Sequence, residues 1–454
     1  MSELSADSNN PRRTRQLVGL YCVLWLVEGL FRKWILPQYS QQLLLIRDPV
    51  VLLIYLIAWR EGVFPNNGWI RFLSVYAIFS LFQAVFQAFG GVPLVIAAFG
   101  FRTLFLHLPL IWIIPRVLSE AQVRTVAYWV MLIAPFLAAL MVAQFGVGAG
   151  HWLNAATIEG GTQIGSVGER IRPAAIFSFI TGPIHYFALC TACVFAGFLT
   201  PRLFPKWLLG LNVCSILIAM SVSGSRTLVL GCMVVAAFGV LAASRRGAGV
   251  FRLFLGVAII FTAYFSLSRL IFFQVGGAVF NERWAGSRES EERSVYARYL
   301  GTFASGFEWS TRVPVFGYGI GMSSNLAVLK FGMEVPIETE WERVVYEIGP
   351  ISALPYLGFR VAVAASLMLL GFRALRTGNY FCLLFAAACS LDFLTGNFRQ
   401  VTTHGFASIC AGLCLASGTW SQRLSSSSEP ESETPPTRPV ARVVRGRGPL
   451  SIGG

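Results

Sequence analysis

Residues 207–244 read WLLGLNVCSILIAMSVSGSRTLVLGCMVVAAFGVLAAS. The stretch consists of two apolar runs on either side of a short, more polar segment, residues 223–227. An apolar run of about 20 residues is long enough to cross a bilayer as an α-helix. A helix is required there because lipid provides no hydrogen-bond partners for backbone amides and carbonyls. The stretch therefore predicts two membrane helices, 207–224 and 226–244, joined by a tight turn.

Similar apolar runs recur along the whole chain. Hydrophobic residues make up 55% of the 454 positions and charged residues make up 13%, whereas a soluble domain carries about 25% charged residues. The sequence therefore predicts an all-α polytopic membrane protein with about twelve transmembrane helices. The other predicted helices cover residues 17–36, 41–59, 71–90, 94–114, 125–145, 173–199, 252–272, 346–371, 380–397 and 403–420.

The predicted helices divide the chain into five regions. Residues 1–16 form a polar N-terminal segment, and residues 17–272 hold the first nine predicted helices. Residues 273–345 form a large loop before the tenth helix, and residues 346–420 hold the last three. The tail, residues 421–454, is rich in Ser, Pro, Glu and Arg. Such a composition cannot bury a core, so we expect the tail to be disordered.

Basic residues set the predicted orientation. Loops that stay in the cytoplasm are enriched in Lys and Arg. Every second connection is basic, which places both termini in the cytoplasm of a bacterial cell and the large loop in the periplasm. We expect the net charge of +14 to face anionic lipid rather than nucleic acid. No small-residue cleavage site follows the basic N-terminus, which favours an uncleaved first helix. The basic connections contain Arg60 and Arg71, Arg116 and Arg124, Arg202 and Lys206, Arg245, Arg246 and Arg252, and Arg373 and Arg376.

Two outer segments, residues 146–172 and 273–345, are too long for tight connections. Loops longer than about 15 residues are uncommon unless they are functional or disordered. The first segment ends in Arg170 and Arg172, directly before a predicted helix. Two Arg beside a helix N-terminus suit an anion, although they could also anchor the helix at the membrane surface. The second segment is rich in aromatic residues, which favours a folded element.

Arg226 lies in the turn Ser223-Gly224-Ser225-Arg226-Thr227. The turn forces this cation to the mouth of a helix, and ionisable groups at such a depth tend to be functional. The alternative is an Arg that snorkels to lipid phosphate. The glycine-rich segment 314–321 does not follow the strand of a βαβ unit, so we expect a tight turn with exposed backbone amides rather than a nucleotide site.

A cluster of carboxylates ends the large loop. Glu340, Arg343 and Glu347 are spaced three and four residues apart and share one helical face. A carboxylate beside cations can act as a base. We expect Glu340 to be that base because it lies at the end of the loop, where a hydrophilic acceptor would approach. We expect Glu347 to support the start of the helix. The alternative is a helix start with local ion pairs.

Charges inside the apolar runs need partners. Glu28 with Arg32, and Asp48 beside Arg47, predict structural ion pairs. His107 and His185 lack the companions of a metal site. HExxH, Walker and GxSxG motifs in a suitable context are missing from the sequence, which excludes metalloproteases, ATPases and serine hydrolases. All nine Cys fall in apolar runs, so no disulfide framework is predicted.

Four motifs, in order, resemble the O-antigen ligase and polymerase superfamily of bacterial envelope glycosyltransferases. The resemblance covers roughly residues 70–420, including the helix layout. Ala175 stands where this family usually has Gly, and the His-Asn pair that its ligases carry before the last motif is missing here. The motifs are Arg170/Arg172-Pro173 with Phe177-Ser178, then Ser223–Thr227, then Arg298 with Pro314-Val315-Phe316-Gly317-Tyr318-Gly319, and finally Glu347-Ile348-Gly349.

The resemblance implies glycosyl transfer from a polyprenyl-diphosphate-linked glycan at the periplasmic face, with no metal, nucleotide or other cofactor. Because the His is missing, it favours a polymerase of surface polysaccharide. A ligase acting on lipid A core or protein, and a non-enzymatic lipid-glycan flippase or transporter, are the alternatives. Membrane lipid and other polysaccharide assembly proteins are the expected partners. The implied catalytic residues are Glu340, Arg226 and Arg298, and the implied substrate-binding residues are Arg170, Arg172, Arg343, Tyr318 and Glu347.

Overall fold

The computed structural model of the chain describes residues 11–157, 171–244, 269–270, 274–278, 301–332, 337 and 339–427. Within these ranges the chain forms helices and turns and no β-strand. The prediction of an all-α protein is therefore confirmed. The predicted helix over residues 252–272 falls almost entirely outside the described residues. The tail was expected to be disordered from residue 421, but residues 421–427 continue the last helix, and the rest of the tail lies outside the described residues.

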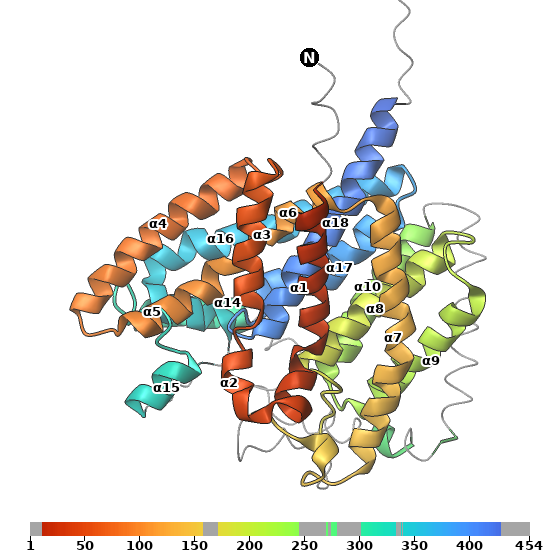
Figure 1. The fold of residues 1–454 in the computed structure, drawn as a ribbon, viewed down its shortest axis with the longest axis horizontal. Coiled ribbons are helices and arrows are strands. Elements are labelled where there is room, and N and C mark those ends of the chain that lie inside the picture. The colour runs from red at the N-terminus through yellow and green to blue at the C-terminus, as the bar shows by residue number, and fades with distance from the viewer. Residues whose placement is uncertain are drawn as a thin grey trace, which may run out of the picture.

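The helices follow one another in the order that Figure 1 shows. Two π-helical segments and two 3₁₀ segments, labelled η, interrupt the first half of the chain. The elements are α1 (Arg12–Leu30), η1 (Phe31–Ile35), η2 (Pro37–Tyr39), α2 (Ser40–Leu43), α3 (Arg47–Arg60), α4 (Gly68–Phe89), α5 (Leu94–Phe101), η3 (Arg102–Leu106), α6 (Leu110–Val117), α7 (Glu120–Gly146), η4 (Trp152–Asn154), α8 (Thr181–Leu199), α9 (Lys206–Val222), α10 (Arg226–Ser244), α14 (Gly301–Ser310), α15 (Asn325–Phe331), α16 (Glu340–Arg376), α17 (Tyr380–Thr395) and α18 (Val401–Ser427).

Seven helical segments in the described ranges are long and apolar enough to cross a membrane. An eighth is formed if Leu94–Leu106 and Leu110–Val117, which are bent by 41°, count as one span. The helices α9 and α17 are apolar but shorter. These findings support a polytopic membrane protein. The seven are Pro37–Arg60, Gly68–Phe89, Glu120–Gly146, Thr181–Leu199, Arg226–Ser244, Glu340–Arg376 and Val401–Gly418.

Two predicted helix boundaries are wrong for identifiable reasons. The helix predicted from residue 173 begins only at Thr181, because Lys33 binds the carbonyl oxygens of Ala175 and Phe177 and holds that segment in turns. The helix predicted from residue 346 begins at Glu340. Thr339 starts it, since its hydroxyl accepts a hydrogen bond from the Glu342 amide while the Glu342 carboxylate accepts one from the Thr339 amide.

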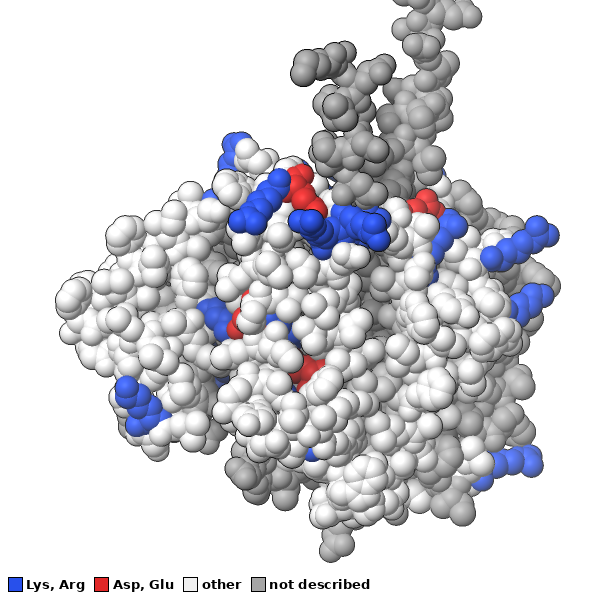
Figure 2. Space-filling model, in the orientation of Figure 1, with Lys and Arg blue, Asp and Glu red and all other residues white. Residues whose placement is uncertain are grey.

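The surface has the charge distribution of a membrane protein. Figure 2 shows Lys and Arg gathered mainly along the upper border of one face, above a broad region that is uncharged apart from small patches in its middle. The helix α4 turns large apolar side chains outward, among them Phe82 and Phe89, which are 71% and 88% exposed. Such a face suits lipid rather than water.

The described chain starts and ends on the same side of the bundle. Figure 1 shows the beginning of α1 and the end of α18 at the upper edge, where α3 also ends. The helix α7 runs from this edge to the opposite one, and α8 runs back. The expectation that the two termini share one side is thus compatible with the helix directions.

This arrangement predicts opposite labelling of two exposed positions. Gly150 follows α7, and Lys206 follows α8 and begins α9. We expect Gly150→Cys and Lys206→Cys to react with a membrane-impermeant maleimide from opposite sides of the membrane. The unaltered chain is the control, because seven of its nine Cys are buried. Labelling of both positions from the same side would contradict the helix directions.

Candidate functional site

Four buried charged residues form what we call the α16 charge network: Glu340, Arg343, Glu347 and Arg360. Arg343 donates two hydrogen bonds to Glu340, at 2.7 and 2.8 Å, and one to Glu347, at 2.9 Å. Arg360 donates at 2.6 Å to Glu340 Oε1, which also accepts from Arg343. All four side chains are 2% exposed or less. The helical spacing of Glu340, Arg343 and Glu347 therefore did predict their contact.

The α16 charge network crosses a break in its own helix. Gly349 adopts φ 75° and ψ 162°, which interrupts α16 before Pro350. Glu340 lies before the break and Arg360 lies after it, so their ion pair joins the two halves. Two carboxylates and two guanidiniums balance in charge. This balance matters because removing one partner from a buried ion pair leaves an uncompensated charge.

Arg360 also binds the end of α17 and the start of the segment that joins α17 to α18. It donates to the backbone oxygens of Phe393, Asp392 and Gly396 at 3.0, 2.8 and 2.7 Å. These carbonyls belong to the last turn of α17 and the residue after it. The Asp392 oxygen also accepts from the Gly396 amide at 2.9 Å. The guanidinium also lies 3.8 Å from the centre of the Phe398 ring. Sequence reasoning missed Arg360, although an Arg within an apolar run was a visible signal.

The glycine-rich segment 314–321 lies against the break in α16. The amides of Tyr318 and Gly319 donate to the carbonyl oxygens of Tyr346 and Glu347 at 2.8 and 3.1 Å. Gly317 has φ 72°, and a Cβ added to it would lie 2.5 Å from the Gly349 nitrogen. The expected tight turn is present, but these two amides are used by α16. The expectation that they are exposed is wrong.

Two glutamines on α4 form hydrogen bonds that stabilise the contact between the glycine-rich segment and α16. Gln83 donates to the carbonyl oxygens of Phe316 and Ile348, both at 2.8 Å. Gln87 donates to the Phe316 oxygen at 2.6 Å and accepts from the Ile320 amide at 3.0 Å. A pair of Gln four residues apart in an apolar helix was the signal that sequence reasoning overlooked. The pair shares one helical face, which here contacts both the glycine segment and α16.

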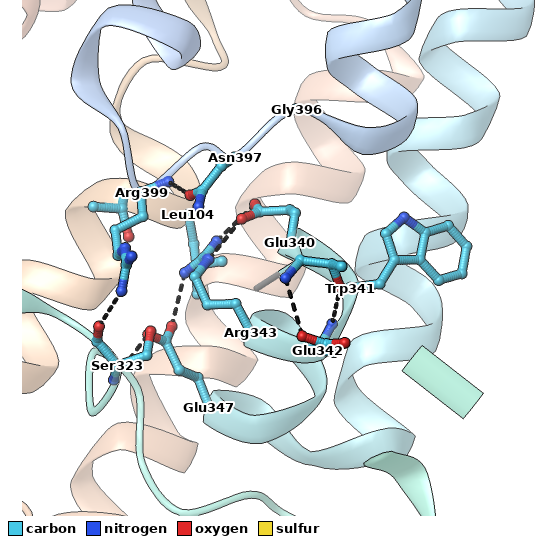
Figure 3. Close-up of polar contacts among 12 residues, drawn as sticks. Leu104, Ser323, Glu340, Trp341, Glu342, Arg343, Glu347, Gly396, Asn397 and Arg399 are labelled. Atoms are coloured by element: carbon cyan, nitrogen blue, oxygen red, sulfur yellow. Dashed lines mark hydrogen bonds and ion pairs between the residues drawn. The ribbon is translucent and has the colours of Figure 1, made fainter. Parts of the chain in front are cut away.

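Ser323 and Arg399 extend the α16 charge network toward the junction of α17 and α18 (Figure 3). The Ser323 hydroxyl donates to Glu347 at 2.5 Å, and Arg399 donates to the Ser323 carbonyl oxygen at 2.5 Å. Arg399 is partly exposed and its amide donates to the Asn397 side chain. Three distant segments, around residues 323, 347 and 399, therefore meet here.

A second charged cluster joins α1, α3 and the start of the α8 region. Glu28 accepts from Arg32 at 3.1 Å and forms an ion pair with Arg47, whose Nε lies 2.9 Å from Glu28 Oε2. Arg32 also donates to the Ser178 hydroxyl at 3.1 Å. A Cβ on Gly29 would lie 2.3 Å from the Ser178 nitrogen, so only glycine permits this approach. The predicted structural pairing of Glu28 is present, and it fixes the segment that contains Phe177 and Ser178.

A third cluster holds Asp48. The carboxylate is bonded to Arg102, and its other oxygen lies 3.3 Å from His107 Nε2. The Tyr21 hydroxyl and His107 Nδ1 are 3.0 Å apart. Asp48 therefore has the structural ion pair that was predicted for it, although Asp48 Oδ1 and His107 Nε2, which face each other, do not form a hydrogen bond. The residues described offer no group of three or more His, Cys, Asp or Glu that could hold a metal ion.

The predicted site residues have different positions. Arg226 is the first residue of α10 and is partly exposed. Arg172, which precedes α8 in the sequence, is also partly exposed. Tyr318 is 46% exposed and its ring lies 4.8 Å from that of Tyr346. Arg170 and Arg298 lie outside the described residues, so their expected convergence with Arg226 stays a prediction.

The expected position of Glu340 is wrong. Its side chain is buried and both carboxylate oxygens accept from guanidiniums. A buried carboxylate held in this way cannot be approached by a hydrophilic acceptor. The helix starts at Glu340, earlier than predicted. Glu340 therefore lies on the same helical face as Arg343, and this face is turned into the protein.

Models of known protein families do not match the chain, and a search of curated proteins found no match either. The functional assignment therefore depends on the motifs and on the geometry around them.

The α16 charge network predicts a large loss of stability on Glu340→Gln. The change is nearly isosteric but leaves two buried guanidiniums facing a neutral amide, which should cost about 3–5 kcal/mol of unfolding free energy. The measurement is an unfolding titration with dodecyl sulfate. Glu308→Gln is the matched control, since Glu308 pairs with Arg312 at 59% and 62% exposure and should change by less than about 1 kcal/mol. Equal effects of the two changes would show that the network is not structural.

The break in α16 predicts that Gly349 tolerates no side chain. A Cβ there would lie 2.1 Å from the Val315 oxygen, and φ is 75°. Gly332 is the control, because it has φ 65° but open space around the added Cβ. Gly332→Ala carries the backbone penalty of about 1–2 kcal/mol for a left-handed residue. Gly349, with ψ 162°, lies in a region that is essentially restricted to glycine, so Gly349→Ala adds a larger backbone penalty to the close contact. We expect Gly349→Ala to lose clearly more stability in the same titration, and a similar loss in both would refute the close contact.

Proposed function

We propose that this protein is a metal-independent membrane glycosyltransferase. It lengthens surface polysaccharide by transferring polyprenyl-diphosphate-linked oligosaccharide repeat units at the periplasmic face. The observation that carries the proposal is the backbone pairing of residues 318–319 with residues 346–347. These segments belong to two of the four motifs that resemble the polymerase and ligase superfamily. Their contact across a long stretch of chain supports a shared site rather than a chance likeness.

A further observation concerns the first motif. Ala175 adopts φ 49°, in the left-handed region. This conformation favours glycine, and Gly is the residue usually found at that place in the motif. The backbone geometry thus supports the resemblance at the very position where the residue departs from it.

The chemistry requires positive charge where a diphosphate leaves. Arg226 begins α10, so its guanidinium adds to the positive end of a helix. A planar guanidinium can bind two phosphate oxygens at once. In this proposal Arg226 and Arg298 hold the diphosphate with Arg170 and Arg172. Tyr318 lines the acceptor side, while the α16 charge network, including Arg343 and Glu347, positions the motifs.

The proposed topology has about twelve transmembrane helices, both termini in the cytoplasm and the large loop in the periplasm. The basic residues near the start of α1 and the end of α3 support it, because Lys and Arg are retained on the cytoplasmic side. This orientation puts Arg226 at the periplasmic end of α10. A lipid-linked donor could reach it from the outer leaflet.

A transporter or flippase of lipid-linked glycan is the second candidate. Broken helices favour it, because transporters commonly bind substrate at such breaks. The breaks here are the 41° bend between Leu94–Leu106 and Leu110–Val117 and the interruption of α16 at Gly349. The two candidates differ in product: a polymerase lengthens the glycan, whereas a flippase moves it unchanged.

The proposal predicts that Arg226→Lys abolishes transfer although it keeps the charge. An ammonium cannot bind two phosphate oxygens in a planar fork, and losing one such donor typically costs about 100-fold in rate or more. The assay uses the full chain in liposomes with lipid-linked repeat units and measures glycan length. Arg124→Lys is the control, since Arg124 lies on the exposed surface in a pair with Glu120. Unimpaired lengthening by Arg226→Lys would refute the role of the guanidinium, and movement of units without lengthening would favour the flippase.

A further inference from the structure

We infer that Thr403, His185 and Asp392 form the relay that takes the proton from the acceptor hydroxyl. The inference rests on the proposed glycosyl transfer and names the base that this reaction needs. The three residues come from α18, α8 and α17. His185 Nε2 lies 3.0 Å from the Thr403 hydroxyl, and Nδ1 lies 3.5 Å from Asp392 Oδ2.

This geometry assigns a role to each ring nitrogen. A carboxylate accepts a hydrogen bond, so Asp392 favours the tautomer that carries its proton on Nδ1. Nε2 is then an acceptor facing the Thr403 hydroxyl. The ring of His185 stacks on Phe406 with centroids 4.8 Å apart and planes 15° apart, which fixes its orientation. Hydroxyl, imidazole and carboxylate thus stand in the order that proton abstraction from an alcohol requires.

Asp392, whose side chain is 14% exposed, differs from the other buried or partly buried acids for which the structure describes ion pairs. Glu28, Asp48, Glu340 and Glu347 each pair with at least one Arg. The ion-pair contact of Asp392 is with an imidazole, because Arg360 donates to its backbone oxygen instead. A carboxylate held by a guanidinium is satisfied at all times. A carboxylate beside a neutral imidazole stabilises that ring when it gains a proton, which is what a general base does.

The relay lies at the same end of the bundle as Arg226. A Cβ on Gly231 would lie 3.8 Å from the Ala188 Cβ, and one on Gly239 would touch the Phe195 ring. The two contacts have nearly the same offset in residue number, so α8 and α10 run parallel and in register. Arg226 is therefore level with the first turn of α8. His185 lies about 3–5 Å deeper along the axis, at about 1.5 Å per residue.

The junction of α17 and α18 connects the relay to the surface. The Thr403 hydroxyl can donate its proton either to His185 Nε2 at 3.0 Å or to Gln400 Oε1 at 3.4 Å, and Gln400 is partly exposed. Arg399, beside it, is also partly exposed. An acceptor hydroxyl that enters beside Gln400 would donate to the Thr403 oxygen, and the Thr403 proton would then point to His185 Nε2. The diphosphate and the acceptor would then approach from neighbouring helices at one end of the bundle.

The reaction step balances with these groups. The acceptor hydroxyl gives its proton to the Thr403 oxygen while the Thr403 proton moves to His185 Nε2. The acceptor oxygen uses its freed electron pair to form a bond with the anomeric carbon of the donor. The bond from that carbon to the diphosphate oxygen breaks, and its electrons leave on the diphosphate, beside Arg226. The imidazolium, held by Asp392, later releases its proton to water.

The test compares Thr403→Val with Thr403→Ser in full-length protein in liposomes that contain lipid-linked repeat units. Val matches the shape of Thr without its hydroxyl, whereas Ser keeps the hydroxyl. We expect Thr403→Val and His185→Gln to lower kcat by about 100- to 10,000-fold, the contribution of general base catalysis. KM for the donor should stay unchanged, and Thr403→Ser should recover most of the rate. A merely structural hydroxyl would not give this division between kcat and KM.

The outcomes separate the base from the proposed function. If the unaltered protein lengthens glycans and Thr403→Val does so at the same kcat, the relay is wrong and the polymerase proposal stands. Equal losses in the Val and Ser variants also overturn the relay. If the unaltered protein does not lengthen glycans, both proposals fail. An unfolding titration of each variant shows whether His185→Gln is folded. The comparison of Thr403→Val with Thr403→Ser tests the relay whether or not His185→Gln folds.

Discussion

The carboxylate of Glu340, held between Arg343 and Arg360, joins the parts of this protein that hydrophobic packing alone could not align. The pair with Arg360 bridges the break in α16 at Gly349. Arg360 also binds two carbonyl oxygens in the last turn of α17. Arg343 pairs with Glu347, whose carbonyl accepts from the glycine segment. Apolar helices in lipid have little hydrophobic reason to choose one packing over another. A buried ion pair favours one packing strongly, because any packing that separates its two partners leaves an uncompensated buried charge.

The same constraint acts wherever a helix is interrupted. A break leaves backbone groups without helical partners, and in lipid these must be satisfied within the protein. The π-helical segment η1 contains Arg32 and Lys33, and η3 begins with Arg102. Lys33 binds two carbonyl oxygens, and Arg102 binds the Leu44 oxygen at 3.1 Å besides Asp48. Charged side chains and helix breaks therefore occur together, because the side chains provide hydrogen-bond partners for backbone carbonyls and the carbonyls provide partners for the charges. Asp392 is arranged differently, because its ion-pair contact is with the His185 imidazole and not with a guanidinium.

Many of the helices were predictable because the hydrophobic runs that form them are continuous in the sequence. Apolar runs identified the helices α4, α7 and α10, and the turn at Gly224, with φ 55°, lies where the polar residues 223–227 indicated. The spacing of Glu340, Arg343 and Glu347 predicted their shared face, because helical periodicity depends on the chain alone. The starts of α8 and α16 were misplaced, since Lys33 and the Thr339 cap override hydrophobicity there.

The sequence by itself determined that the chain is a membrane protein, which of its segments are helical and which charges are neighbours along one helix. Only the tertiary structure decided which charges meet across helices. Arg360, Gln83 and Ser323 reach partners between 20 and 265 residues away, and His185 meets Thr403 from 218 residues away. Such contacts depend on helix order, tilt and the position of each break. These arise from the requirement that every buried polar group in the whole bundle find a partner at once.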